Sequence, residues 1–317
     1  MPKTMPPVQC FIGFDVAKDT IVLHDTLSGA THTIRNERKA IAAFVADLDE
    51  HIVLAVCEAT GGYETILLET LVAHGIPVHR ADAVKVKAFI RSLGIHGKTD
   101  ALDAKALALY ARERHSRLAP WQPEDKDHLQ LKALIERRAD LVAMRVAERN
   151  RTQAPGAKAI KASLLAVLDV LNQQIAVLDS QIRAVIKISA ALRKSCAVLQ
   201  SQKGVGFVTA ATLLALMPEL GRLTRRQVAS LAGLAPHPKE SGSLKGYRRL
   251  KGGRPEVRRT LFMAAMTAVR HDDKLKAFHG KLIGKGKKPL SSLSAVMRRL
   301  IVILNAKIRD SILSQQS

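Results

Sequence analysis

The chain has 317 residues, enough for about two domains. Hydrophobic residues make up 47% of it and charged residues 25%, which is a globular composition and excludes a disordered chain. Aromatic residues account for only 3%, so we do not expect stacking of bases on aromatic side chains to dominate any nucleic-acid contact. The formal net charge is +22.

The excess positive charge lies mostly in the last third of the chain. Residues 1–199 carry a net charge of +5 and residues 200–317 a net charge of +17. This asymmetry points to a polyanion as partner, either a nucleic acid or an anionic membrane; the alternative is a basic face kept for solubility. A membrane fits poorly, because the sequence has no uninterrupted apolar stretch of about 18 residues and no signal-peptide pattern.

Cysteine usage indicates a reducing compartment. Cys10, Cys57 and Cys196 are odd in number and far apart, so they suggest neither a zinc knuckle nor a disulfide scaffold. We therefore expect a protein of a reducing cytoplasm with a nucleic-acid partner.

The first 120 residues alternate between strand and helix patterns. Short links between the first three strands favour an antiparallel meander, and the later alternation favours a mixed sheet covered by helices. The chain leaves this domain at residues 119–123, which hold two prolines and Trp121. The predicted strands are 8–15, 20–26, 30–36, 52–59 and 76–81, and the predicted helices are 37–50, 61–75 and 98–114.

Helical patterns dominate the rest of the chain. Residues 124–152 read as a helix that Pro155 and Gly156 end, and a heptad seam follows. That seam is either packed in a hairpin within one subunit or exposed as a dimerising coiled coil, and we favour the coiled coil because a long exposed seam needs a partner. The seam residues are Leu164, Leu168, Leu171, Ile175, Leu178, Ile182 and Val185.

The C-terminal part is expected to be mainly α-helical and to carry a basic loop. Helices are predicted at 203–217, 224–234, 256–272 and 291–313, and residues 237–255 read as a glycine-rich loop without periodicity. The predicted domains are therefore 1–120, 121–198 and 199–317.

Four acidic residues stand where a metal site could form. Asp15 and Glu58 end predicted strands, and Asp100 and Asp103 lie one helical turn apart on one face. Clustered carboxylates suit Mg²⁺ or Mn²⁺, and two such ions about 3.5–4 Å apart can bind the attacking and leaving oxygens of a phosphodiester. Taken singly, each acid could equally be a turn former or a helix-dipole partner.

The basic loop contains a candidate nucleophile. Ser241 and Ser243 flank Gly242 among many cations, which can stabilise phosphate charge. Attack of a serine on DNA phosphate would give a phosphoserine intermediate. His237 is the only nearby histidine in the sequence and no triad is evident, so an ordinary solvated loop is the alternative.

Two further features could contact phosphates. Lys203-Gly204-Val205-Gly206 before an apolar helix could be a helix-hairpin-helix-like element that holds a phosphate on backbone N–H groups, or an ordinary tight turn. Cations around the serine loop could bind the nucleic-acid backbone. The predicted nucleic-acid contacts are Lys203, Gly204, Gly206, Lys245, Arg248, Arg249, Lys251, Arg254, Arg258 and Arg259.

Together these motifs resemble a transposase of the insertion-sequence-110 family, the bridge-RNA-guided recombinases, to which the Piv-type DNA invertases also belong. The resemblance spans almost the whole chain in the family's order. The motifs that carry it are IGFDVAKD (12–19), CEATGGYE (57–64), GKTDALDAKALA (97–108), KGVGFVTAATLLA (203–215), LAGLAPHPKESGSLKG (231–246) and GGRPEVRRTLFMAAM (252–266).

The resemblance implies an N-terminal RuvC-like, ribonuclease-H-type domain with a DEDD tetrad of Asp15, Glu58, Asp100 and Asp103, a coiled-coil middle and a C-terminal transposase domain. It maps the nucleophile to Ser241, with a 5′-phosphoserine link to DNA. It further implies two Mg²⁺ or Mn²⁺ ions, catalysis shared between subunits, and a structured non-coding guide RNA that chooses target and donor DNA.

Three alternatives stay open from the sequence. One is a Piv-like invertase acting at fixed sites without a guide, and another is a RuvC-like junction nuclease in which Ser241 is only a loop residue. The third is a non-catalytic nucleic-acid-binding protein. We expect a homo-oligomer, a dimer from the heptad seam and a tetramer on synapsed DNA from the resemblance.

Overall fold

The computed structural model describes residues 10–48, 52–94, 97, 99–123, 125–237, 240–241, 244–245 and 249–314. The chain forms two compact units, Met1–Pro123 and Glu124–Ser317, here called unit 1 and unit 2. Sequence reasoning separates residues 121–198 from 199–317, whereas residues 124–198 and 199–317 lie together in unit 2.

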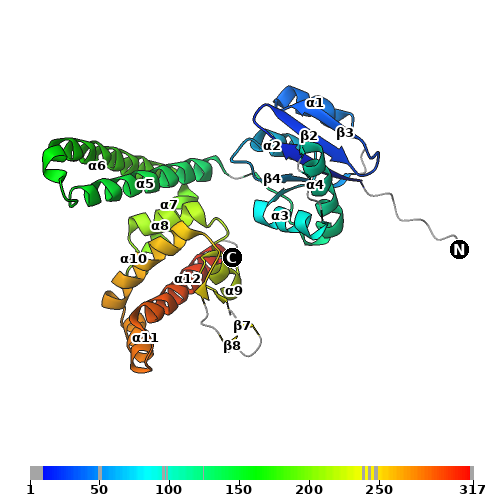
Figure 1. The fold of residues 1–317 in the computed structure, drawn as a ribbon. Helices are drawn as coiled ribbons and strands as arrows, with labels where there is room; N and C mark the ends of the chain where they lie inside the picture. Colours follow the sequence, from blue (N-terminus) through cyan, green and yellow to red (C-terminus); the bar gives the residue numbers. More distant parts are fainter. Residues whose placement is uncertain are drawn as a thin grey trace. The chain divides into compact units, whose positions relative to one another are not determined.

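Unit 1 is built on a mixed five-stranded sheet (Figure 1). The strand order is β3-β2-β1-β4-β5, and β2 alone runs antiparallel to its neighbours. This confirms the expected mixed sheet, with the meander on one side and the parallel strands on the other. The strands are β1 (Cys10–Val16), β2 (Thr20–Asp25), β3 (Thr31–Arg35), β4 (Ile52–Glu58) and β5 (Val78–Ala81).

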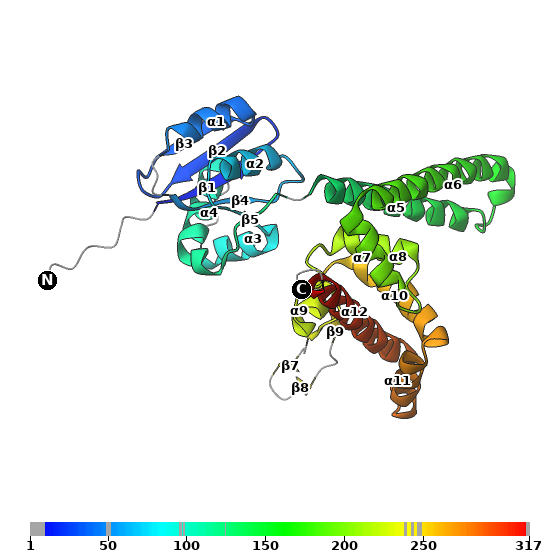
Figure 2. The ribbon, with the colours of Figure 1, turned by 180° about the vertical axis from the view of Figure 1, so that it is seen from behind.

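Helices cover both faces of this sheet (Figures 1 and 2). Alternate residues of β1 point to opposite faces: Ile12 and Phe14 join the core under α1 (Arg38–Ala46) and α2 (Thr65–Ala73), and Phe11 joins the core under α3 (Ala83–Ser92) and α4 (Asp100–Arg114). A 3₁₀ turn, η1 (His115–Arg117), follows α4. The sheet thus forms the middle layer of a three-layer unit.

Helix α3 is absent from the sequence prediction. Its signals are Asp82, whose side chain accepts hydrogen bonds from the backbone N–H groups of Val84 and Lys85, and the i, i+3 pair Val86 and Phe89, which is buried. This buried pair and the half-buried Ile90 face the core, which is too short an apolar pattern for a helical period to stand out.

Unit 2 begins with a hairpin of two long helices, α5 (Lys126–Arg151) and α6 (Ala157–Ile188) (Figure 1). The pair is antiparallel: Arg138 Nε donates to Asp179 Oδ1 at 2.6 Å, and Arg145 pairs with Asn172 nearer the tip. All seven seam residues are buried or half-buried. The predicted seam therefore packs within its own chain. Our prediction that this seam is exposed and forms the dimer contact is wrong, because α5 covers it.

The remaining helices of unit 2 surround α12 (Pro289–Leu313), which contacts α7, α9, α10 and α11. Leu131 and Ile135 of α5 and Ile182 and Ile186 of α6 belong to the same core as these helices. The base of the hairpin is therefore continuous with the C-terminal bundle. Its other helices are α7 (Ala190–Gln200), α8 (Phe207–Leu216), α9 (Arg225–Leu231), α10 (Pro255–His271) and α11 (Asp273–Gly284), of which α7 and α11 were not predicted.

Two helices, α6 and α12, are long and apolar enough to cross a membrane, judged by length and composition alone. Helix α12 is the central core helix of unit 2, so its apolar side chains have partners within the protein. Helix α6 keeps much of its apolar surface uncovered.

The predicted loop at 237–255 contains short strands. Strand β6 (Pro236–His237) pairs with β9 (Arg249–Leu250), and β7 (Glu240–Ser241) pairs with β8 (Leu244–Lys245), both antiparallel. Two-residue strands leave no periodic pattern in a sequence, which explains why the loop prediction was wrong here.

Candidate active site

The first two predicted acids end neighbouring parallel strands. Phe14 of β1 is in register with Cys57 of β4, so the next residues, Asp15 and Glu58, lie side by side at the carboxyl edge of the sheet. Both residues are half-buried. In open α/β sheets, ligand sites lie outside this edge.

Helix α4 carries the other two acids to the same edge. A Cβ at Gly13 would lie 2.1 Å from the Ala104 carbonyl oxygen and 2.3 Å from the Ala108 nitrogen, so α4 rests directly on β1 where only glycine fits. At the other end of the contact, the rings of Phe11 and His115 are 5.3 Å apart. Helix α4 therefore runs antiparallel to β1.

This direction places the first turn of α4 near the end of β1. Asp103 directly precedes Ala104, and Asp15 is two residues beyond Gly13 on the same face of the sheet. Thr99 caps the helix and accepts a hydrogen bond from the Leu102 N–H. Asp103 is half-buried and Asp100 is exposed.

The donor chemistry and the backbone placement fit a divalent metal, since carboxylate oxygens are its preferred ligands. In the described part of the chain, no three Asp, Glu, His or Cys side chains come together as a group that could hold a metal ion. The structure thus brings the backbones of the four acids to one edge without grouping their side chains as metal ligands. Burial raises the pKa of the neighbouring Cys57 thiol to about 12, and its side chain is fully buried in the core under α1 and α2.

Two residues that the sequence analysis missed fix the loops at this edge. Glu64, 1% exposed, accepts hydrogen bonds from the Thr60 N–H and hydroxyl and from the Gly62 N–H, and its Oε1 lies 2.7 Å from Arg80 Nη2. Burial alone would raise the pKa of Glu64, but these hydrogen bonds and the Arg80 charge outweigh it and hold the pKa below its ordinary value. These interactions fix the conformation of the loop after Glu58.

Asn36 links the two strand-end loops. Its Nδ2 donates to the Ala17 carbonyl at 2.9 Å and to the Tyr63 carbonyl at 3.0 Å. Its buried Oδ1 has no hydrogen-bond partner among the described residues. Asn36 stands immediately after β3, a position that a search for strand-end acids does not consider.

The serine loop rises from a closed stem in unit 2. Ser241 ends β7 and is in register with Leu244 of β8. At the stem, a Cβ at Gly253 would lie 2.1 Å from the Gly233 nitrogen, and both glycines have positive φ. Only glycine allows the two ends of the loop to meet this closely.

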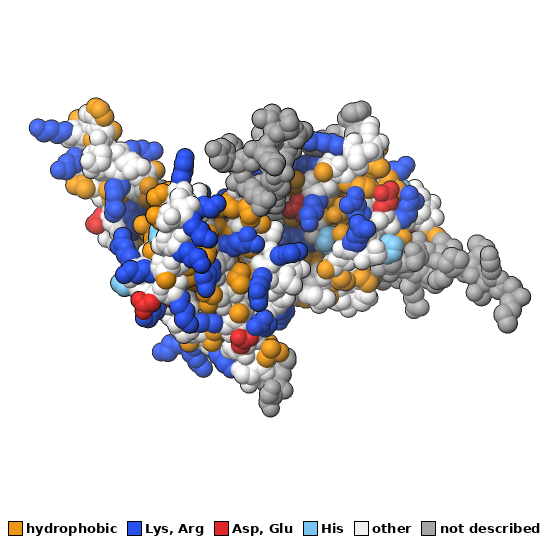
Figure 3. Space-filling model, turned by 90° about the horizontal axis from the view of Figure 1, so that it is seen from below, with side chains coloured by type: hydrophobic (Ala, Val, Ile, Leu, Met, Phe, Trp, Pro, Cys, Tyr) orange, Lys and Arg blue, Asp and Glu red, His pale blue; other side chains and the backbone are white. Residues whose placement is uncertain are grey.

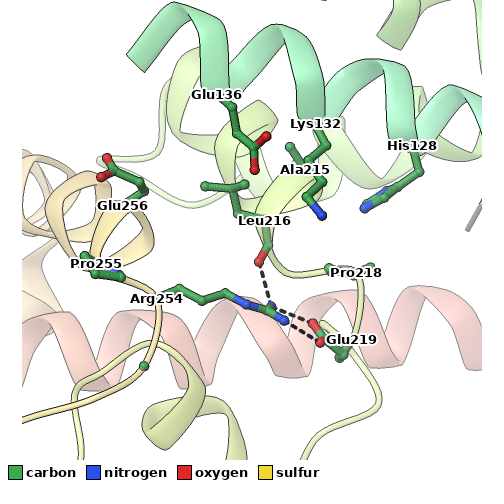
Figure 4. A pocket seen from close by; sticks show the side chains of 11 residues that line it. His128, Lys132, Glu136, Ala215, Leu216, Pro218, Glu219, Arg254, Pro255 and Glu256 are labelled. Atoms are coloured by element: carbon green, nitrogen blue, oxygen red, sulfur yellow. Dashed lines mark hydrogen bonds and ion pairs between the residues drawn. The ribbon is translucent and has the colours of Figure 1, made fainter. Parts of the chain in front are cut away.

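Two predicted nucleic-acid contacts, Arg254 and Arg258, hold this stem, and Figure 4 shows the contacts of Arg254. The Arg254 guanidinium binds both carboxylate oxygens of Glu219 at 2.7 and 2.8 Å and donates to the Leu216 carbonyl at 2.6 Å. Burial alone would raise the pKa of Glu219, but Arg254 outweighs it and lowers the pKa. Arg258 donates to the carbonyls of Gly233 and Gly252.

The remaining predicted contacts differ in their surroundings. Gly204 has a φ of 93° and approaches Ala268 of α10 so closely that a Cβ would lie 2.7 Å from its Cα, so it fits the tight-turn alternative. Gly206 is the N-cap of α8 with open space around it, and Lys203 and Lys251 are exposed. Arg259 is exposed and pairs with Glu256, while Arg248 and Ser243 lie outside the described residues, and of Lys245 and Arg249 only the strand positions are described.

Figure 3 shows Lys and Arg side chains spread over the visible face of unit 2, with few Asp or Glu among them. This agrees with the net charge of +17 in residues 200–317.

Comparison with known proteins defines the class. Residues 12–155 match a family model for the DEDD domain of IS110 transposases, described as "Transposase", and residues 196–280 match the model "Transposase IS116/IS110/IS902 family". The chain is thus a transposase, an enzyme that cleaves and rejoins DNA strands. The chain belongs to the IS116/IS110/IS902 family of transposases.

Individual relatives agree with this assignment. The pilin gene-inverting protein of Moraxella lacunata is 28% identical over 314 residues, which cover 95% of this chain and 96% of the relative. The transposase for insertion sequence element IS1111A of Coxiella burnetii is 27% identical, covering 82% of this chain and 78% of the relative. Among solved structures, RuvC of Thermus thermophilus in complex with a Holliday junction substrate matches with a TM-score of 0.29 and 15% identity, covering 36% of this chain and 100% of that one.

The N-terminal unit carries the DEDD domain of this family on a mixed five-stranded sheet, and a largely helical region follows it. DNA is the substrate that this family implies, and a DEDD nuclease domain implies a divalent metal.

Proposed function

We propose that the protein is an RNA-guided DNA recombinase of the bacterial cytoplasm that uses a metal-binding tetrad and a serine nucleophile. The observation that supports the proposal is that Asp15 and Glu58 lie at the ends of neighbouring strands, at the sheet edge toward which the start of α4, with Asp100 and Asp103, is directed. These acids would hold two Mg²⁺ or Mn²⁺ ions, which when bound neutralise phosphate charge and polarise the scissile phosphate.

Ser241 is the proposed nucleophile. Its Oγ bonds to the phosphorus and loses its proton, while the bond from phosphorus to the 3′ oxygen breaks and that oxygen takes up a proton. This leaves a 5′-phosphoserine link and a free 3′ hydroxyl, and attack by a second 3′ hydroxyl restores the serine. The closed stem at Gly233 and Gly253 supports this role, because it presents the serine from a fixed base.

The nucleophile is tested by trapping the covalent adduct on labelled DNA. Ser241→Ala is expected to abolish the adduct, and Ser243→Ala, the matched control one glycine away, to retain it. If Ser241→Ala still forms the adduct and Ser243→Ala does not, then Ser243 is the nucleophile. Normal strand cleavage by both variants, with no adduct in the unsubstituted protein, would support a RuvC-like junction nuclease instead.

The tetrad is tested by a charge-only change. Asp15→Asn is expected to abolish recombination while preserving DNA binding, because it removes a metal ligand and little surface charge. Asp19→Asn removes the same charge from an exposed site four residues further on and is expected to stay active. Full activity of Asp15→Asn would remove Asp15 from the site.

The guide RNA accounts for part of the excess charge. Residues 200–317 carry +17, which can serve two polyanions, the DNA and an RNA that selects it. Sequencing the RNA that copurifies from the native host tests this. A single abundant RNA encoded beside the gene is expected.

A second candidate is a site-specific DNA invertase that needs no guide. It is favoured by the match to the pilin gene-inverting protein of Moraxella lacunata, which covers 96% of that relative. Inversion of a DNA segment by the RNA-free protein would establish this candidate and refute RNA guidance.

We also propose a homo-oligomer that joins through the uncovered face of α6. Four β-branched side chains there follow heptad spacing, and each is 44–57% exposed. A second copy of this chain would cover them, giving a dimer, and two dimers would form a tetramer on synapsed DNA. Val170→Glu is expected to give a monomer in sedimentation, and an unchanged mass would refute this contact. The four residues are Ile160, Val167, Val170 and Val177.

A further inference from the structure

A groove lies beside the stem of the serine loop. It has a volume of about 880 Å³ and is lined on one side by Leu234, Pro236 and Leu250, which belong to the stem, and on the other by residues of the α11–α12 turn and the start of α12. Pro236 and Leu250 are paired across the β6–β9 ladder. We call this the stem groove.

Three cations line the stem groove: Lys287 and Lys288, just before α12, and Arg298 within it. All three are exposed, and in the described part of the chain none of them is ion-paired with an acid. The lining residues of the groove include no Asp or Glu. Its charge is therefore uncompensated from within the described protein.

Two other charged hollows of unit 2 differ in this respect, while a further one holds the single cation Arg270 in a mainly apolar lining without Asp or Glu. The hollow around Arg254 contains Glu136, Glu219 and Glu256, and the one beside Lys203 contains Asp272 and Asp273 (Figure 4). Acids in these hollows repel phosphate, and in the first they already engage the arginine. Among these hollows, the stem groove alone combines several cations with an acid-free lining.

The rest of the lining points to a nucleic-acid backbone. Apolar side chains of Pro236 and Leu250 suit the sugar, and the Ser291 hydroxyl can hydrogen-bond a phosphate. No aromatic side chain is among the described residues that line the groove. Such a surface holds a strand without reading its sequence. Ser241 follows Pro236 by five residues, so its Cα lies at most about 18 Å from that of Pro236.

We propose that the stem groove holds the sugar–phosphate backbone of the DNA strand that Ser241 attacks. The phosphates contact Lys287, Lys288 and Arg298, and the deoxyribose rings lie against Pro236 and Leu250. The choice of DNA over RNA rests on the proposed function of Ser241, since the groove wall is the stem of its loop.

Salt-dependent DNA binding tests the charge contribution, with every variant made in the Ser241→Ala chain so that no chemistry intervenes. The double variant Lys287→Gln, Lys288→Gln loses two phosphate contacts. For single-stranded DNA, we therefore expect the plot of the logarithm of the association constant against the logarithm of the salt concentration to become less steep by about 1.4. The matched control is Lys276→Gln with Lys281→Gln, which removes two exposed charges of α11 outside the groove. An equal reduction in both pairs would overturn the proposal.

Photo-cross-linking tests the position. A benzophenone amino acid replacing Ser291 is expected to cross-link DNA, and the same residue replacing Lys276 is not. Cross-linking of Ser291 to RNA alone would overturn the assignment to DNA. A cross-link from position 291 to DNA, in a protein that forms no Ser241 adduct, would refute the serine chemistry but support DNA binding in the stem groove. An adduct at Ser241 without that cross-link would refute DNA binding in the stem groove.

Discussion

Gly13→Ala tests whether the contact between α4 and β1 positions the acids. The added Cβ would lie 2.1 Å from the Ala104 carbonyl oxygen and 2.3 Å from the Ala108 nitrogen, both of which are backbone atoms that cannot rotate away. To restore ordinary contact, α4 must move away from the sheet by about 1.3 Å. Overpacking of this kind costs about 1–3 kcal/mol, and we expect the upper end because backbone must shift.

The same movement displaces the first turn of α4. Asp103 directly precedes Ala104, so it moves with the helix away from Asp15. A misplacement of about 1 Å at a reacting centre can cost about 100-fold in rate. We therefore expect Gly13→Ala to lower DNA cleavage by about 100-fold while DNA binding, which depends on the cations of unit 2, changes little.

Urea denaturation measures the free energy of unfolding, and hydrogen exchange of the α4 amides measures the local stability of this helix. Cleavage of labelled DNA measures the reaction rate. Gly280→Ala is the control: it lies within α11 with nothing within 4 Å of a Cβ. This change is expected to stabilise the helix by about 0.4–1 kcal/mol. Stability within about 0.5 kcal/mol of the unsubstituted chain for Gly13→Ala, together with full cleavage, would refute the reasoning.

Three further predictions follow from charged groups. Glu64→Gln is expected to destabilise unit 1 by about 2 kcal/mol at neutral pH, less than the about 3–5 kcal/mol of a fully buried pair because Arg80 is 37% exposed. Because the folded-state pKa of Glu64 is lowered, its contribution is present above the ordinary carboxyl pKa and is lost as pH falls through the folded value, so the difference in urea midpoint should shrink in acid. Arg254→Gln is expected to reduce Ser241 adduct formation with little change in DNA affinity, because it loosens the stem held by Glu219. DNA affinity of the whole protein, measured by fluorescence anisotropy, is expected to fall by about 1,000-fold or more between about 50 and 200 mM salt, through counterion release.

Each of these predictions has an outcome that contradicts it. Glu69→Gln, which breaks an exposed ion pair with Arg38, is the control for Glu64→Gln and should change stability by less than about 1 kcal/mol; equal effects of the two variants would deny Glu64 its role. Loss of DNA affinity in parallel with the adduct would make Arg254 a DNA contact. Affinity that is flat with salt would contradict a phosphate-dominated interface.

Local patterns were sufficient for much of unit 1. Apolar runs that end in Asp15 and Glu58 predicted both the strands and the acids at their ends. Gly13, where α4 contacts β1, lies in the same sequence motif as Asp15, residues 12–19. They did not predict α3, whose buried side is essentially Val86 and Phe89. Asn36 and Glu64 were also missed, because their importance comes from hydrogen bonds to residues of other loops.

In unit 2 the same reasoning found the apolar seam of α6 and chose the wrong partner for it. The heptad spacing of Leu171, Ile175 and Ile182 indicates that this face of the helix packs against another helix. The spacing does not indicate which helix, because any helix with a matching apolar face can pack there. The short loop at Pro155 and Gly156 brings α5 back along α6, so the chain supplies its own partner.

The sequence by itself determined the five strands and most helices of unit 1, the long helices of unit 2, the four spaced acids and the concentration of positive charge after residue 200, since these depend on residue type and local period. Only the tertiary structure decided which way α4 runs across β1, that Arg254 holds a loop stem, and that Lys287 and Arg298 share a groove with Leu250. These are contacts between segments far apart in the chain, and their energies depend on packing and burial that no local pattern records.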